Sequence, residues 1–175
     1  KVWGKSQKID IPEDGVVIDI FTIDFPQNIT QVHFIKLRLF DTKGKEVANT
    51  FYWRSNDKYE GRKTLTGPTS SGFEDLSKLK QVQLKTRYKA YQEGDRHFIK
   101  AEIKNPSSTI AFFTQLQLLD QDKKPVRPSF YTDNFFSLLP GESKTVIIET
   151  AASDMPSEPT FVVKGWNIKP SSFKL

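Results

Sequence analysis

Asp133 and Asn134 are the polar pair best placed to do chemistry, because aromatic side chains lie on both sides of them. Those aromatics are Phe130, Tyr131, Phe135 and Phe136. Aromatic rings stack on sugar rings while a few polar groups fix the orientation, so one interpretation is a ligand site. The other is a corner between two strands, with the aromatics in the core. The turn at 140–141 and the alternation over 143–149 favour this second interpretation, in which Asn134 bonds neighbouring backbone groups.

Tryptophan is the other residue type suited to holding a sugar. Trp3, Trp53 and Trp166 each lie in a strand-like run, which favours burial in a core. Gly165 before Trp166 indicates a bulge or a close backbone approach, which could turn that ring outward. The candidate carbohydrate-contacting residues are therefore Trp166, Asp133, Asn134 and Tyr131.

The residue inventory argues against catalysis by this chain. A glycosidase needs two carboxyl groups roughly 5–5.5 Å apart for retention, or roughly 6.5–9.5 Å apart for inversion, inside a cleft. Most of the 21 acidic residues lie in turns such as 93–95 and 120–122, where a carboxylate caps backbone N–H groups and stays solvated. The chain has no cysteine and only two histidines, so disulfides, thiolate ligation and histidine-based triads or zinc sites are not expected. We predict no catalytic residue, no cofactor and no metal.

Charge and hydropathy exclude two kinds of partner. The net charge is +5, but basic and acidic residues are interleaved at nearly every turn, whereas a nucleic-acid binder gathers Lys and Arg on one stripe. No run of eighteen apolar residues is present, so we expect nothing that spans a membrane.

The elements that position these residues are predicted to be strands. Apolar and polar residues alternate over 82–91, 97–104, 111–119, 126–131, 144–151 and 160–168, with turn signals between them. Only a short helical turn is expected, at 73–79, and no helical period separates the strands, which excludes a parallel α/β fold. Short strands of this kind are typical of an immunoglobulin-like β-sandwich. We predict an all-β chain with a complete sandwich at 81–170 and a linker at 61–80.

The segment 1–60 is predicted to be a partial, truncated β-sandwich. Strand-like runs cover 2–11, 16–24, 32–41 and 46–54, about half of the seven strands that such a sandwich needs. Because the chain starts in mid-strand, we interpret 1–60 as the back half of a domain cut from a longer protein. An open sheet presents unpaired backbone groups and an apolar face, so we expect it to fold back on the second sandwich or to self-associate.

Three stretches of the sequence also carry a family resemblance. They are FIKLRLFDTKGKEVANTFYWRS at 34–55, NPSSTIAFFTQLQLLDQDKKPVRP at 105–128 and TDNFFSLLPGE at 132–142. Together they resemble the C-terminal β-sandwich region of family-2 glycoside hydrolases, in the branch of the exo-β-glucosaminidases and β-mannosidases.

This resemblance implies that the catalytic glutamates lie on an upstream (β/α)8 barrel, so no catalytic residue is carried over to this chain. The region would then brace that barrel and wall one side of the cleft for a β-linked oligosaccharide. The resemblance also implies a periplasmic or extracellular parent enzyme. A free-standing module that binds carbohydrate or protein through a sheet face is the alternative function.

Overall fold

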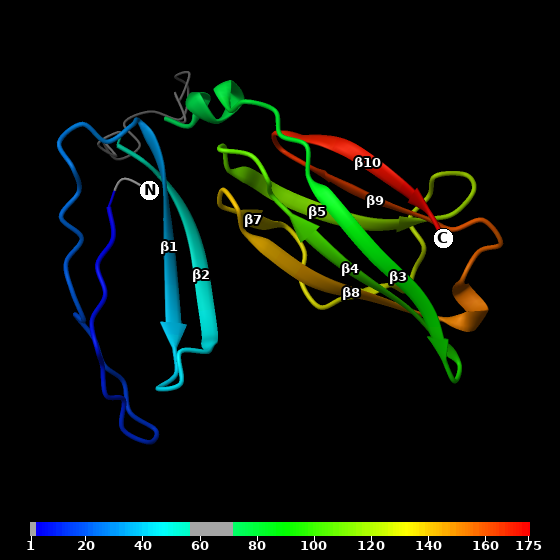
Figure 1. The fold of residues 1–175 in the computed structure, drawn as a ribbon, viewed down its shortest axis with the longest axis horizontal. Helices are drawn as coiled ribbons and strands as arrows, with labels where there is room; N and C mark the ends of the chain where they lie inside the picture. Colours follow the sequence, from blue (N-terminus) through cyan, green and yellow to red (C-terminus); the bar gives the residue numbers. More distant parts are fainter. Residues whose placement is uncertain (1–2, 57–71) are drawn as a thin grey trace, which may run out of the picture. The chain divides into compact units, whose positions relative to one another are not determined.

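The computed structural model describes residues 3–56 and 72–175 and divides the chain into two compact units, Lys1–Leu76 and Ser77–Leu175. Figure 1 shows strands in both units. Within the described ranges, the only helical elements are two short 3-10 helices, η1 (Glu74–Lys78) and η2 (Ala152–Asp154). This confirms the all-β prediction and the helical turn predicted at 73–79. In the same ranges, no helix is both apolar enough and long enough for a bilayer crossing.

The regular part of the first unit is one antiparallel hairpin, the described portion of the predicted partial sandwich. Strands β1 (Val32–Phe40) and β2 (Glu46–Ser55) pair from Val32 opposite Ser55 onward. Asp41 closes the turn, because its Oδ1 accepts hydrogen bonds from the backbone N–H groups of Lys43 and Lys45, both at 2.9 Å. The hairpin predicted from the sequence is therefore confirmed.

The strands predicted at 2–11 and 16–24 are wrong. Residues 3–31 form no strand, although the turn between the two runs is present, with Gly15 N–H donating to Pro12 O at 2.9 Å. Alternation of side chains gives a segment two faces, but a strand also needs a neighbour for its backbone hydrogen bonds. Among the described residues, β1 and β2 pair only with each other, so neither strand provides backbone hydrogen bonds for residues 3–31 to form a strand.

The second unit is a complete sandwich of two four-stranded antiparallel sheets (Figure 1). One sheet has the order β10-β9-β5-β7 and the other β3-β4-β8-β6. The strand bounds are β3 Lys85–Glu93, β4 Arg96–Lys104, β5 Ala111–Leu119, β6 Phe130–Tyr131, β7 Phe136–Leu138, β8 Ser143–Ala151, β9 Thr160–Gly165 and β10 Ile168–Lys174. Alternate residues of the long strands face inward. The innermost side chains are Ile99, Ala101, Ile103, Leu116, Leu118, Val146, Ile148, Phe161 and Val163.

Two predicted strands of this unit are shorter than expected. The run at 126–131 is a strand only over Phe130–Tyr131, and the run at 160–168 is two strands that reverse at 166–167. The reversal has a physical cause, since the Asn167 side chain binds backbone groups of other segments instead of continuing the strand. Much of the predicted linker at 61–80 lies outside the described residues, and the predicted domain boundaries remain predictions.

Candidate functional site

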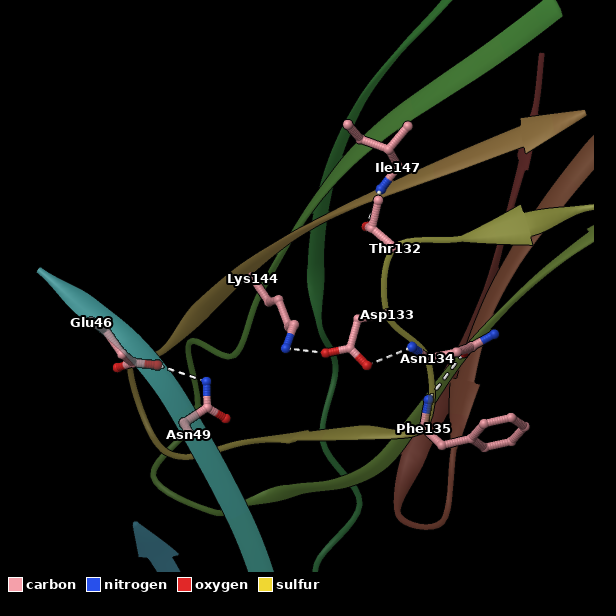
Figure 2. A network of polar contacts seen from close by, with 8 residues as sticks. All are labelled: Glu46, Asn49, Thr132, Asp133, Asn134, Phe135, Lys144 and Ile147. Carbon is pink, nitrogen blue, oxygen red and sulfur yellow. Dashed lines mark hydrogen bonds and ion pairs between the residues drawn. The ribbon is translucent and has the colours of Figure 1, made fainter. Parts of the chain in front are cut away.

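The corner that holds the candidate residues crosses from one sheet of the sandwich to the other. Strand β6 pairs with β8, whereas β7 pairs with β5 in the opposite sheet. Residues 132–135 make the crossing, and Thr132 anchors its start, because Thr132 N–H donates to Ile147 O at 3.0 Å and Thr132 Oγ1 accepts from Ile147 N–H at 3.0 Å. Figure 2 shows this turn of the chain with its polar contacts.

Asn134 acts as a substitute for strand backbone. Its Oδ1 accepts from Leu116 N–H at 2.8 Å and its Nδ2 donates to Leu116 O at 2.9 Å, so both backbone groups of Leu116 are satisfied by one amide. The same oxygen also accepts from Phe135 N–H at 3.1 Å (Figure 2). A ladder bond is thereby continued past the end of β7, and the predicted bonding of Asn134 to backbone is confirmed.

Tyr131 satisfies the next backbone N–H group along the same edge of β5. Its hydroxyl oxygen accepts from Leu118 N–H at 2.9 Å, and burial raises the pKa of Tyr131 above its usual value. The phenol therefore stays neutral at ordinary pH. An open edge strand invites pairing with another chain, and here side chains from the corner close that edge.

Asp133 is tied to the corner by two contacts. Its Oδ1 accepts from Asn134 N–H at 2.7 Å, and its Oδ2 forms an ion pair with Lys144 (Figure 2). The Lys144 ammonium also lies 5.2 Å from the centroid of the Phe136 ring. The polar atoms of Asp133, Asn134 and Tyr131 are thus used within the fold.

Trp166 lies in the turn between β9 and β10, where it approaches Phe112 of β5. Its backbone N–H donates to Phe112 O at 3.1 Å, and its side chain is 59% exposed, so the expected burial of this tryptophan is wrong. Gly165 explains the position, because a Cβ there would lie 2.5 Å from Ile168 Cδ1 and 2.8 Å from Phe113 O. The close backbone approach predicted for Gly165 is confirmed. Trp53 in the first unit is 42% exposed and Trp3 is 36% exposed, contrary to the burial expected for them.

Two phenylalanines beside this corner were not singled out as site residues from the sequence. Phe113 and Phe135 both have positive φ, at 57° and 58°, which is rare for a bulky residue and costs conformational energy. Their ring centroids are 5.4 Å apart, and the side chains are 37% and 50% exposed. Such strain gathers at functional sites, and the sequence holds no signal for it, because positive φ is usually announced by Gly or Asn.

Two buried asparagines that hold this end of the sandwich were also missed. Asn105 is fully buried, with Nδ2 donating to Thr109 O at 2.8 Å and Leu138 O at 3.0 Å. Asn167 Oδ1 accepts from Phe112 N–H at 2.8 Å, and its Nδ2 donates to Ile110 O at 2.8 Å. A buried amide with all its groups satisfied fixes loops to one geometry.

The His, Asp and Glu side chains of the described residues form no metal-binding cluster. In 3–56 and 72–175, no three His, Asp or Glu side chains form a group that could hold a metal ion. The turn at 120–122 is held by the Asp120 carboxylate, which accepts from the N–H groups of Asp122 at 2.9 Å and Lys124 at 2.8 Å.

The two paired sheets and the corner that joins them define an immunoglobulin-like β-sandwich. The chain belongs to the family described as the exo-beta-D-glucosaminidase Ig-fold domain, whose model matches residues 64–168. This confirms the resemblance to exo-β-glucosaminidases drawn from the segments at 105–128 and 132–142.

Similar proteins are much longer than this chain. The exo-beta-D-glucosaminidase of Streptomyces avermitilis is 30% identical over 149 residues, which are 79% of this chain and 16% of that protein. That of Amycolatopsis orientalis is 29% identical over 165 residues, 87% of this chain and 16% of that protein. The crystal structure of the Amycolatopsis orientalis exo-chitosanase CsxA matches with a TM-score of 0.77 at 23% identity, covering 89% of this chain and 20% of that chain, which shows the shared fold.

Proposed function

We propose that this chain is a non-catalytic C-terminal region of a family-2 glycoside hydrolase of the exo-β-glucosaminidase type, where it braces an upstream catalytic barrel. The family match over residues 64–168, to a domain known from enzymes of which this chain spans 16%, carries the proposal. A sandwich whose β5 edge at Leu116 and Leu118 and whose buried amides are satisfied within one unit is suited to this work, because these parts keep one geometry without further partners.

We further propose that the corner end of the sandwich, the surface around Phe135 and Trp166, forms one wall of the parent enzyme's cleft for a β-linked oligosaccharide. Phe135 and Trp166 are at least half exposed, and the Phe135 ring packs against that of Phe113, with centroids 5.4 Å apart. The polar atoms of Asp133, Asn134 and Tyr131 are hydrogen-bonded within the fold and stabilise the corner. A sugar would therefore contact the rings of Phe135 and Trp166 rather than these polar atoms.

The test compares hydrolysis by three preparations: this chain alone, the parent without it and the complete parent. We expect no turnover by the chain alone, reduced stability of the shortened parent, and full activity only in the complete protein. Aryl β-glucosaminide and aryl β-mannoside are assayed side by side, because the family branch leaves both sugars open. Turnover by the purified chain alone, after contaminants are excluded, would contradict the proposal.

A free-standing module that binds carbohydrate or protein is the second candidate. The 59% exposure of Trp166 favours it, because exposed aromatics are the usual contact of such modules. The reading frame that encodes this chain decides between the two. A barrel with paired glutamates encoded directly upstream supports the bracing role, and its absence supports the module.

We also propose a periplasmic or extracellular location for the parent. Fractionation of the source cells, with detection of the complete protein, tests it. Recovery from the cytoplasm alone would contradict it.

A further inference from the structure

The outer face of the sheet β3-β4-β8 carries basic residues in a regular arrangement. On β4, Ile99, Ala101 and Ile103 are buried, so the residues between them, Lys100 and Glu102, point outward. Strand β3 pairs with β4 from Lys85 opposite Lys104 without a register shift, and β8 pairs with β4 as far as Arg96 opposite Ala151, also without a shift. Both strands therefore continue this face.

Two pairs of lysines lie directly opposite each other on this face. Lys85 is opposite Lys104 and Lys89 is opposite Lys100, and all four side chains are exposed. Side chains at such positions have Cβ atoms about 4.5–5.5 Å apart, and like charges there destabilise the sheet. None of the four makes an ion pair with a residue that the structure describes. The fold therefore keeps two unfavourable pairs where one Glu in each would remove the repulsion.

Opposite charges on the same face are matched, which makes the lysine pairs distinct. Arg87 lies opposite Glu102, between the two lysine pairs. Arg96 donates to Glu149 at 2.5 Å at the far end of the sheet. The positive charge left over is thus concentrated in two places, separated by four residues along the strand, or about 13 Å.

An aromatic pair lies next to one of these places. Tyr91 is opposite Phe98, and their rings stack with centroids 5.3 Å apart at 18°. A surface depression beside them is lined by Lys89, Tyr91, Gln92, Glu93 and Lys100. Aromatic carbon, two ammonium groups and hydroxyl-binding oxygens in one hollow suit a sugar that bears an acid group.

The spacing of charge indicates which polyanion fits. Each strand of duplex DNA carries one negative charge per about 3.4 Å of the helix axis, so a strand laid along this face would place phosphates against Glu102 and Glu93. A polysaccharide with an acid group on only every second sugar spaces its charges much further apart, so neighbouring acid groups can lie on the two lysine pairs without contacting Glu102. We propose that the outer face of β3-β4-β8 binds an acidic polysaccharide, with its carboxylates or sulfates on the two lysine pairs and a sugar ring beside Tyr91.

The ligand class is opposite in charge to a glucosamine polymer, whose amines are cationic. Binding on this face would therefore be independent of any contact that the corner end makes with such a polymer. The role is to hold the protein on an acidic matrix, and it goes beyond the proposed bracing of a catalytic barrel.

The test measures binding of the 175-residue chain to hyaluronate, which has a carboxylate on every second sugar, by titration calorimetry at low and high salt. The variant Lys89→Gln/Lys100→Gln is compared with a control, Lys123→Gln/Lys124→Gln, which removes the same charge from an exposed turn. We expect the first variant to bind about tenfold more weakly. The control should bind like the parent. The first variant should also melt no lower than the parent, because it removes a like-charge pair.

Three results would overturn the proposal. An equal loss of affinity in the control would show that only net charge matters. Displacement of hyaluronate by duplex DNA or by a poly-glutamate peptide, at a lower concentration of charged groups, would assign the face to nucleic acid or to an acidic protein. Absence of binding at low salt would exclude a polyanion site altogether.

Discussion

The two units of this chain differ in how much of their apolar surface they cover. In the second unit two sheets enclose one core, in which Phe161, Leu118 and Val146 are fully buried. In the first unit, Val32 and Leu76 are the only buried hydrophobic residues among those described. Its large exposed apolar side chains include Val16, Ile18, Leu37, Leu39, Phe40, Val47 and Tyr52.

The difference shows what a second sheet contributes. A two-stranded hairpin is marginally stable at best in water, whereas a sheet that packs on another gains a dry interface. Strand-like sequence is present in both units, but only the second contains its own partners. Stability of the first unit should accordingly depend on what covers it.

Self-association is the largest effect expected from this difference. Covering some 400 Å² of apolar surface returns about 25 cal/mol per Å², or roughly 10 kcal/mol before entropic costs. We expect the complete chain to form dimers or larger species as its concentration rises, through the sheet β1-β2. Light scattering over a concentration series measures this, with the unit Ser77–Leu175 alone as a monomeric control. A complete chain that stays monomeric, with its apolar face open to water, would contradict the expectation.

Removal of one aromatic ring should produce the second-largest difference between the units, measured as loss of unfolding free energy. Phe161 is fully buried, with its ring centroid 5.1 Å from Tyr88 and 4.8 Å from Phe173. Phe161→Ala should lower the free energy of unfolding of the second unit by about 3–5 kcal/mol. The control Tyr52→Ala removes a ring that is 49% exposed in the first unit, and should change stability by less than about 0.5 kcal/mol.

Urea unfolding of both variants makes this comparison. Equal losses from the two substitutions would show that the first unit has a core of its own.

The sequence predicted the sandwich because its hydrophobic period survives in the structure. Leu116 and Leu118 are buried as the alternation requires, and the turns at 41–45 and 12–15 close where Gly and Asp indicate. The strand predictions failed where residues distant in the sequence determine whether a strand forms or ends. The segment 3–31 has strand composition without a neighbouring strand, and Asn167 ends a strand by binding Phe112 and Ile110, more than fifty residues away.

The candidate site was predicted in part for the same reason. Asn134 was expected to bond nearby backbone, and it does so, but its main partner Leu116 lies on another strand. The positive φ of Phe113 and Phe135 follows from packing of the folded corner, and no local residue type announces it.

Loss of the Asn134 amide should have a smaller effect than loss of Phe161. Asn134→Ala leaves both backbone groups of Leu116 without partners, and should cost about 1–3 kcal/mol of stability in the second unit. Asn134→Asp keeps the acceptor and loses the donor, so its stability should lie between that of the parent chain and that of Asn134→Ala. The control Asn49→Ala removes an exposed amide that bonds Glu46 on β2 (Figure 2) and should be nearly neutral.

Thermal unfolding followed by circular dichroism ranks these variants. An Asn134→Ala chain that melts like the parent would contradict the assigned structural role, and a sugar affinity lost with it would favour the binding module.

The smallest expected effect is a pH dependence confined to the first unit. His33 is 8% exposed, neither ring nitrogen makes a hydrogen bond of normal geometry with a described residue, and the Phe25 ring lies edge-on with its centroid 5.2 Å away. Burial, and secondarily the charge of Arg54, lower the pKa of His33 below its ordinary 6.5, while the backbone of Thr30 raises it by less.

The sign of the effect follows from that direction. As the pH falls through about 6.5, the unfolded chain takes up a proton on this histidine before the folded chain does. The stability that neutral His33 contributes is therefore present above that pH and lost below it. His33→Phe, which keeps an edge-on ring contact with Phe25, should remove the dependence, whereas the same change at His97 on β4 should leave it. Amide protection factors of β1 and β2 measure the local stability at about pH 7 and about pH 5, because they divide out the base-catalysed rise of intrinsic exchange with pH. Lower protection at the higher pH would reverse the sign and show that His33 is charged in the folded hairpin.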